Sequence, residues 1–196
     1  ANILELTREI PETKEFEFIY KHNTTGEEIR VKTEDLANVS SDYSYHDRID
    51  VITDPGVPAK IHDFFIKNAQ GEDLTESILS EPGYSIFVIA YDLSEVRLKS
   101  VKKFKEVITP WQDAGRKIHA FTNSDPQEFE QFRHEHQLPF SFYQLDRTAL
   151  KSVIRSNPGY ILMHEGIVVK RWSSRNAPSM QDLEKAIEKF EKKAGK

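Results

Sequence analysis

The sequence predicts an α/β fold of three layers, in which helices cover both faces of a mixed central sheet, preceded by an N-terminal β-hairpin extension. Two observations support this fold class. From about residue 60 onward, strand-like and helix-like patterns alternate along the chain. Residues 84–91, YSIFVIAY, are nearly all apolar, which is typical of a central strand that is buried on both faces.

The N-terminal part predicts the hairpin. Residues 15–20 (EFEFIY) and 28–32 (EIRVK) alternate polar and apolar side chains, and turn-forming residues 23–26 (NTTG) lie between them. An isolated hairpin is only marginally stable in water, so we expect it to dock on the main body or to pair with a sheet edge. Residues 40–58, rich in Ser, Asp, Tyr, Pro and Gly, follow the hairpin, and residues 54–58 (DPGVP) are expected to form the boundary loop. The predicted division is therefore an extension over residues 1–58 and a main domain over residues 59–196.

The main domain is predicted to alternate strands and helices. Asp125 is a suitable N-cap before Pro126, and Ser179 with Asp182 frames the start of the last helix. In chain order the predicted elements are strand 61–67, helix 73–79, strand 84–91, helix 94–114, strand 117–122, helix 126–137, strand 140–145, helix 147–155, strands 160–163 and 167–172 around a tight turn, and a final helix from residue 179.

The size, charge distribution and hydropathy of the chain argue against nucleic-acid binding and against a membrane-spanning segment within it. The chain has 196 residues, of which 38% are hydrophobic and 30% charged, so it can build one core of ordinary size. Residues 1–58 carry 6 Lys/Arg and 13 Asp/Glu, a balance of −7, whereas residues 59–196 carry 21 and 19, a balance of +2. Such an acidic leader argues against a nucleic-acid partner. No run of about 18 apolar residues that could span a bilayer occurs. The first residue is not Met, so we expect a processed chain or a piece of a longer one.

The order of elements, ending in a proline loop, a β-hairpin and a helix, resembles the thioredoxin superfamily, in its peroxiredoxin and TlpA-like branch. The resemblance implies that Pro158 is the family's loop proline, which is usually cis, and that the family's Cys-x-x-Cys pair falls on Leu93 and Val96. No cysteine occurs anywhere in the chain. Because the thiolate is the nucleophile of thioredoxin chemistry, the family's catalytic role does not carry over.

Four further segments resemble the soluble region that follows the membrane helices of certain DoxX-type proteins. The likeness covers most of the chain, including the leader hairpin. It implies that the chain is the soluble portion of a membrane protein, and that its partner is a membrane module of the same or an adjacent polypeptide. By analogy with related redoxin domains, we expect an extracytoplasmic location. The segments are YSYHDR (43–48), PAKIHDF (58–64), GEDLT (71–75) and IRSNPG (154–159).

The thioredoxin resemblance also implies a binding groove between the start of the first long helix and the proline loop. Its positions in this chain are Asp92, Leu93, Ser94, Val96, Asn157 and Pro158. A helix N-terminus has free N–H groups and a partial positive charge, so it can hold an anion. Asp92 and Ser94 can also cap the helix themselves and fill the donors that a ligand needs. Self-capping is therefore the alternative to a peptide groove.

Seven histidines raise the question of a metal site. His134 and His136 are two positions apart, which on a helix points their rings in nearly opposite directions, so we expect no metal there. A site assembled across the fold from His62, His119 and His164 stays open at this stage. Phosphate-binding and nucleophile-elbow motifs do not occur in the sequence, and we expect no cofactor.

These patterns together predict a redox-inactive thioredoxin-like module for binding or assembly. A protein partner is expected, and a homodimer is a further expectation, because a strand of the leader hairpin can extend a neighbouring sheet edge. The alternative is an enzyme that uses Asp92 or the cross-fold histidines near the ancestral active site.

Overall fold

The computed structural model describes residues 2–61 and 63–195 and divides the chain into two compact units. The larger unit contains the residues up to Thr7 together with those from Lys60 onward, and the smaller unit is Arg8–Ala59. Within the described residues, no helix is both long enough and apolar enough to cross a membrane.

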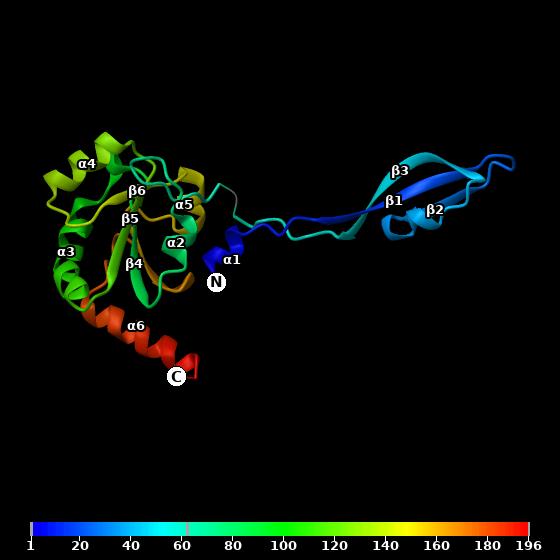
Figure 1. The fold of residues 1–196 in the computed structure, drawn as a ribbon. Coiled ribbons are helices and arrows are strands. Elements are labelled where there is room, and N and C mark those ends of the chain that lie inside the picture. Colours follow the sequence, from blue (N-terminus) through cyan, green and yellow to red (C-terminus); the bar gives the residue numbers. More distant parts are fainter. Residues whose placement is uncertain (1, 62, 196) are drawn as a thin grey trace. The chain divides into compact units, whose positions relative to one another are not determined.

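A five-stranded mixed sheet forms the centre of the larger unit (Figure 1). β4, β5 and β6 are parallel, whereas β7 runs antiparallel to both β4 and β8. β4 lies at the centre of the sheet, and its residues 85–89 are all buried, as its apolar sequence predicts. In the spatial order β6-β5-β4-β7-β8, the strands are β6 (Phe142–Gln144), β5 (Lys117–Thr122), β4 (Tyr84–Ile89), β7 (Gly159–His164) and β8 (Ile167–Trp172).

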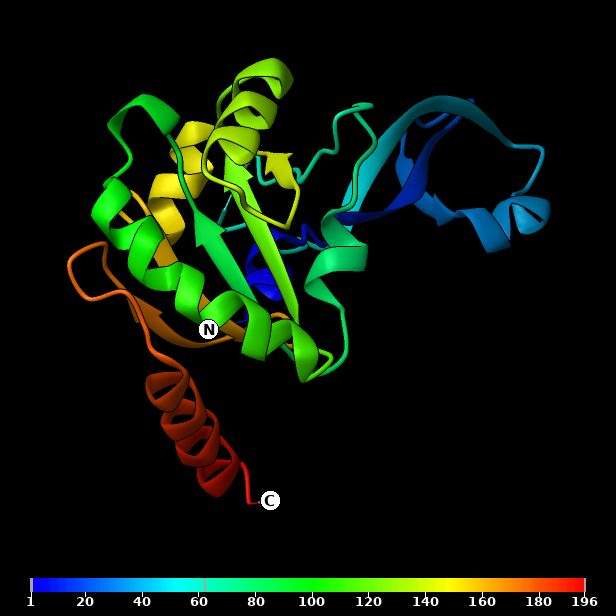
Figure 2. The same ribbon diagram turned by 90° about the vertical axis from the view of Figure 1, so that its left-hand side faces the viewer.

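Helices cover both faces of this sheet, which confirms the predicted three-layer α/β/α arrangement. On one face, α3 (Leu98–Asp113), α4 (Pro126–Glu135) and α6 (Met180–Lys193) enclose a first core that includes Trp111. On the other face, α1 (Ile3–Thr7), α2 (Thr75–Leu79) and α5 (Arg147–Val153) enclose a second core that includes Phe121. Figure 2 turns the face that carries α3 toward the viewer.

Side-chain caps that the sequence predicts set the starts of two helices. Asp125 accepts hydrogen bonds from the N–H groups of Gln127 and Glu128 at 2.9 and 3.0 Å, at the start of α4. At the start of α6, the Ser179 hydroxyl accepts from the Asp182 N–H at 3.2 Å, and the Asp182 carboxylate accepts from the Ser179 N–H at 3.0 Å. This reciprocal capping box satisfies N–H groups that a helix cannot pair internally.

The predicted start of the long helix after β4 is wrong, because the helix begins at Leu98 and not at Ser94. A single 3-10 turn, η2 (Leu93–Glu95), comes first. The reason is local. The carboxylate of Asp92 accepts hydrogen bonds from the N–H and the hydroxyl of Ser94 and closes a tight turn, and residues 96–97 then adopt extended conformations that separate the turn from the helix.

Among the described residues of the predicted strand 61–67, that is 61 and 63–67, only Lys67 pairs with the sheet. Lys67 exchanges backbone hydrogen bonds with Gln144 of β6 at 2.9 and 2.8 Å. The N–H of Ile66 donates instead to the hydroxyl of Thr75 at 2.8 Å, so the ladder does not continue. The alternation in the sequence is real, because Ile66 is buried and Phe65 is exposed, but β6 is too short to pair with a whole strand.

The smaller unit is a three-stranded antiparallel sheet in the order β2-β1-β3. β1 (Thr13–His22) and β2 (Glu28–Lys32) form the predicted hairpin, and a 3-10 helix, η1 (Thr33–Asn38), follows. β3 (Tyr43–Asp54) pairs along the whole of β1 and is a third strand that the sequence analysis does not predict, whereas residues 55–58 of the predicted boundary loop lie outside the named strands. Apolar residues alternate with polar ones at Tyr43, Tyr45, Ile49 and Val51, but charged residues interrupt the pattern at 46–48 and most of the strand is exposed, so the alternation is weak.

The first residues lie with the larger unit, although the sequence places them in the extension. The N–H of Ile3 donates to the carbonyl of Gly166, in the turn between β7 and β8, at 2.8 Å. The side chain of Ile3 is buried in the second core. The carbonyl of Leu6 also accepts hydrogen bonds from the N–H groups of Lys60 and Ile61 at 2.8 and 3.0 Å, so α1 is attached at both ends. These contacts depend on distant residues and leave too short a pattern to predict from sequence.

A glutamate and a histidine form a polar pair beside the second core. The Nε2 atom of the buried His119 lies 2.7 Å from the Glu81 carboxylate, and Nζ of Lys117 donates to the same carboxylate at 2.6 Å. Burial alone raises the pKa of Glu81, but the hydrogen bonds with Lys117 and His119 outweigh it. The pKa of Glu81 therefore lies below its ordinary value of 4.5.

Replacing Ser179 by Ala removes half of the capping box. We expect Ser179→Ala to lower the free energy of unfolding by about 1 kcal/mol, because an N-cap hydroxyl is lost. Ser80→Ala is the matched control, since Ser80 is exposed and its hydroxyl has no partner among the described residues, and it should change stability by less than about 0.5 kcal/mol. Denaturant titration measures both variants. Equal stabilities would contradict the role of the box.

The stability that Glu81 contributes should depend on pH. Because the pKa of Glu81 is lower in the folded chain, its contribution is complete above the unfolded value of 4.5 and is lost as the pH falls through the folded value. Glu81→Gln should cost about 1–3 kcal/mol near neutral pH, since hydrogen bonds to a charged group are weakened, and should flatten the loss of stability below about pH 5.

Urea unfolding at a series of pH values measures this effect. Glu188→Gln is the control, because Glu188 is an exposed glutamate on α6, and it should leave the pH dependence of the free energy of unfolding as it is in the parent chain. If the free energy of unfolding of Glu81→Gln changed with pH as steeply as that of the parent chain, the role of the Glu81–His119 pair would be contradicted.

Candidate functional site

Asp92 holds together the segment between β4 and α3. Its carboxylate accepts hydrogen bonds from the Ser94 hydroxyl at 2.6 Å, from the Ser94 N–H at 3.2 Å and from Nη2 of Arg147 at 3.1 Å. The hydrogen bonds from Ser94, assisted by the Arg147 charge and opposed by burial, hold the pKa of Asp92 below its ordinary value. Asp92 is therefore ionised and engaged within the chain, as the self-capping alternative predicts, although it caps η2 and not α3.

Packing residues occupy the two positions that correspond to the family's cysteine pair. Leu93 is only 6% exposed and belongs to the first core. Val96 is half-buried and lines, with Pro158 and Tyr160, an apolar cavity of about 20 Å³. Such a cavity has room for about one water molecule. Neither side chain offers a nucleophile, and Leu93 is too deeply buried to line a surface groove.

The proline loop (residues 154–158) lies against residues 92–95, which we call the Asp92 turn. The peptide bond between Asn157 and Pro158 is cis, as the resemblance predicts. The side-chain amide of Asn157 donates to the carbonyl of Asp92 at 2.7 Å, and the carbonyl of Asn157 accepts from the N–H of Arg97 at 3.4 Å. The structure thus brings Asp92 and Asn157 together from positions 65 residues apart. The amide oxygen of Asn157 is buried and has no hydrogen-bond partner among the described residues.

An open hollow of about 710 Å³ lies beside the proline loop. β7 begins directly after the loop and β8 ends at Trp172, which pairs with Tyr160. This antiparallel register places the residues that precede β7 next to those that follow β8. The Ser156 hydroxyl ties the two segments together, because it accepts from the N–H of Ser174 at 2.6 Å and donates to the carbonyl of Pro158 at 2.9 Å.

Three arginines line this hollow, which we call the arginine hollow. Arg155 belongs to the proline loop, and Arg171 and Arg175 lie at the end of β8 and in the turn after it. All three are exposed, and none lies within ion-pair distance of a carboxylate in the described part of the chain. The one described carboxylate in the lining belongs to Glu95, and it lies 4.0 Å from Nη2 of Arg147.

The sequence does not reveal the arginine hollow, because its lining comes from separate stretches around residues 91–95, 154–157 and 171–175. Nothing in the local pattern around any one arginine marks a site. Only the pairing of β7 with β8 brings the second and third stretches together. One feature of the sequence could have indicated the hollow. Arginines occur both shortly before the predicted loop proline, at Arg155, and at the end of the hairpin that follows it, at Arg171.

The two described histidines of the predicted cross-fold site do not meet, and His62 lies outside the described residues. His119 contacts the ring of Phe87 on the face of the second core. His164 stacks on Tyr84 and contacts Phe190 of α6, on the face of the first core. The two rings therefore lie on opposite faces of the sheet. Among the described residues, no group of three or more histidine or acidic side chains could hold a metal ion.

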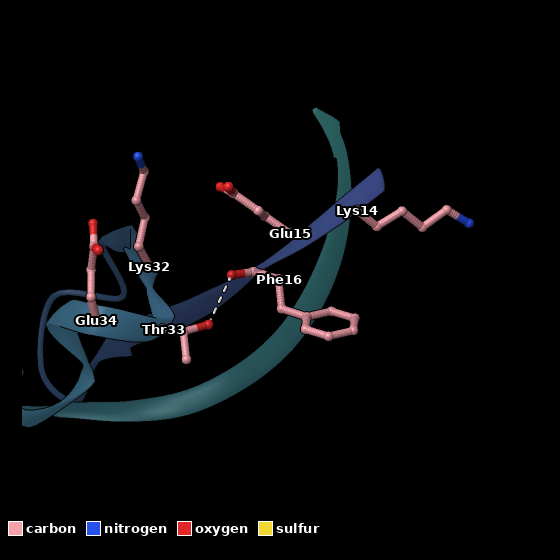
Figure 3. Close-up of a pocket in the computed structure, with 6 residues that line it drawn as sticks. All are labelled: Lys14, Glu15, Phe16, Lys32, Thr33 and Glu34. Atoms are coloured by element: carbon pink, nitrogen blue, oxygen red, sulfur yellow. Dashed lines mark hydrogen bonds between the residues drawn. The ribbon is translucent and has the colours of Figure 1, made fainter. Parts of the chain in front are cut away.

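A second hollow, of about 360 Å³, lies on the smaller unit (Figure 3). Two lysines and two glutamates line it, so its charges balance. Lys14 and Glu15 point away from each other, and the Thr33 hydroxyl donates to the carbonyl of Phe16 at 3.4 Å. Because the charges balance, this hollow favours neither anions nor cations. Its lining residues are Lys14, Glu15, Phe16, Lys32, Thr33 and Glu34.

No protein-family model and no curated protein matches this chain. Solved structures match it with low sequence identity. A thioredoxin-like protein from Aeropyrum pernix is 13% identical, with a TM-score of 0.50, and the match covers 65% of this chain and 89% of that protein. A thiol-disulfide oxidoreductase from Bacteroides fragilis is 15% identical, with a TM-score of 0.48 and coverages of 65% and 96%. A thiol peroxidase from Chromobacterium violaceum is 18% identical, with a TM-score of 0.47 and coverages of 65% and 83%.

Identities this low show the fold alone. The order of the five strands, the helices on both faces and the likeness to the Aeropyrum pernix protein agree with one another. The chain therefore has a thioredoxin-like fold without a cysteine.

Proposed function

We propose that this chain is a redox-inactive thioredoxin-like module for binding or assembly. The observation that carries the proposal is the packing of Leu93 into the core at the position of a family cysteine, in a chain that contains no cysteine. The Asp92 turn and the cis proline loop are nevertheless kept and joined by a hydrogen bond. A fold that keeps these loops and lacks the thiolate can bind a partner, but it has no thiol with which to exchange disulfides.

The alternative function, an enzyme that uses Asp92 or the histidines, has less support. Asp92 is bound by Ser94 and Arg147 and its pKa is lowered, whereas an effective general base has a pKa near the working pH. His119 and His164 lie on opposite faces of the sheet and cannot act on one substrate together.

We also propose that the native protein joins this module to a DoxX-like membrane part. The support is the sequence resemblance of the four segments between residues 43 and 159. In that arrangement the membrane module is the constant partner, and by the same analogy the thioredoxin-like module is extracytoplasmic.

The smaller unit supports a protein partner, including a second copy of the chain. The register of its three strands places seven large apolar side chains on one side of the sheet, which we call the apolar face, together with Arg48 and Asp50, while Ile19, Ile49 and Val51 lie on the other side. Only Val31 of this set is buried, whereas Tyr45 is 58% and Ile52 is 53% exposed. A small sheet gains stability when its apolar side is covered. The apolar face consists of Phe16, Phe18, Tyr20, Ile29, Val31, Tyr45 and Ile52.

Fractionation of native cells tests the membrane proposal. An antibody against this chain should detect a band well above 22.7 kDa in the membrane pellet, because the membrane module adds its own mass. The purified chain should show no insulin reduction and no peroxidase activity with dithiothreitol as electron donor, and an ordinary thioredoxin serves as the positive control.

Two results would overturn these proposals separately. A soluble band at the size of this chain would remove the DoxX-like membrane part. Thiol turnover by the cysteine-free chain would remove the redox-inactive module.

Self-association through the apolar face can be measured directly. We expect the double variant Tyr45→Ser/Ile52→Ser to weaken dimerisation by at least about tenfold, because each change removes large apolar area from the contact. Glu15→Ser/Asp47→Ser is the matched control, since both residues lie on the opposite side of the same sheet. Sedimentation equilibrium over a range of concentrations gives the dissociation constants. A parent chain that stays monomeric throughout would contradict the homodimer.

A further inference from the structure

We infer that the arginine hollow binds an extended polypeptide segment that is rich in carboxylates. This inference rests on the proposed function of a binding module and names the chemistry of its partner. The hollow is formed by Arg155, Arg171 and Arg175 with the aromatic side chains of Tyr91 and Trp172.

The charge in the hollow is unbalanced in favour of anions. Three guanidinium groups line it, and the only described carboxylate there, that of Glu95, lies within 4.0 Å of Arg147. A guanidinium presents a planar fork of donors that fits a carboxylate in a bidentate way. The contrast with Arg147 is direct, because Arg147 donates to Asp92 at 3.1 Å, while the three arginines of the hollow have no such partner among the described residues. An external carboxylate would supply it.

The shape of the hollow favours a chain segment over a single small anion. A volume of about 710 Å³ accommodates several residues of a peptide. One arginine, Arg155, lies in the proline loop on one side of the hollow, and Arg171 and Arg175 lie at the end of β8 on the other. Tyr91 and Trp172 add apolar surface, which the stems of glutamate side chains can contact.

The adjoining backbone also suits an extended peptide. β8 is the last strand of its sheet, and on its outer side the described residues pair with it only at Ile167, through an isolated bridge to Asn2. The outer edge toward Trp172 therefore offers main-chain groups to an added strand. The exposed side chains of Lys170 and Arg171 lie along this edge and favour an acidic strand.

A labelled peptide tests the inference on the full chain. The probe is a fluorescein-labelled peptide of alternating Glu and Ser, and the control peptide has Gln at every Glu. Fluorescence anisotropy at low salt should show binding of the Glu peptide at least about tenfold tighter than that of the Gln peptide, because guanidinium–carboxylate pairs account for the difference. Raising the ionic strength should weaken binding of the Glu peptide, since the three arginines are exposed and salt screens their charges.

Variants locate the binding site. Each single alanine variant should raise the dissociation constant of the Glu peptide by about three- to tenfold, and the triple variant should abolish measurable binding. The single variants are Arg155→Ala, Arg171→Ala and Arg175→Ala. Arg171→Lys keeps the charge but loses the planar fork, so we expect an intermediate loss. Arg30→Ala removes the same side chain from the smaller unit and should leave binding unchanged. Circular dichroism and thermal unfolding verify that each variant is folded.

The other outcomes each overturn the inference. Equal binding of the Glu and Gln peptides, or losses in Arg30→Ala as large as those in the hollow, would place recognition elsewhere. Tighter binding to phosphatidylglycerol vesicles than to the Glu peptide, with the same arginine dependence, would assign the hollow to a membrane surface. No peptide binding by a chain that lacks thiol turnover and fractionates with membranes would overturn this inference alone, and the proposed function would stand.

Discussion

Strand β7 pairs with β4 on one side and with β8 on the other, and this double pairing fixes the positions of all the candidate groups at one end of the sheet. The register with β4 brings the proline loop, which precedes β7, against the Asp92 turn, which follows β4. The register with β8 brings the same loop against the residues after Trp172. Since β4 and β7 are buried along most of their length, any slip of one residue would exchange the two cores. The site is therefore as well defined as the core itself.

Local interactions occupy the end of the fold where the resemblance places the family's cysteines. Leu93 gives apolar packing to the first core, and Asp92 satisfies the donors of Ser94 with its own carboxylate. Asn157 then donates to the Asp92 carbonyl, so the turn and the proline loop support each other. Each of these hydrogen bonds contributes only about 1 kcal/mol, but they act on neighbouring loops that the two cores already hold in place. This end of the fold is thus held together by hydrogen bonds and packing, without a thiol.

Local and periodic features of the chain are visible in the sequence, and features that depend on distant pairing are not. The apolar run of β4, the N-cap Asp125 and the capping box at Ser179 identify their elements because each acts within a few residues. The start of α3 at Leu98 does not follow from periodicity, because the Asp92 side chain competes for the first turn. β3 is hard to predict because charged residues interrupt its alternation and most of its residues are exposed. For the candidate site, the proximity of Asp92 to Asn157 follows from the family resemblance, whereas the arginine hollow depends on the register of β7 with β8.

Two sets of three arginines in the larger unit differ in their partners, and the difference separates structural from available charge. Arg116, Arg133 and Arg147 each donate to a carboxylate of the same chain, and such pairs contribute to the local structure. Arg155, Arg171 and Arg175 have no carboxylate partner among the described residues, although acidic residues outnumber basic ones by 32 to 27 over the whole chain.

The chain has more carboxylates than basic groups, but none of the described carboxylates pairs with these three arginines. All three line the arginine hollow. Arg97, also exposed and without a described partner, lies beside the same loop, where its N–H donates to Asn157. Exposed guanidinium groups cost little when solvated, so they can stay unpaired until a partner with several carboxylates arrives. Binding then gains from several weak pairs formed at once, while the fold itself depends on none of them.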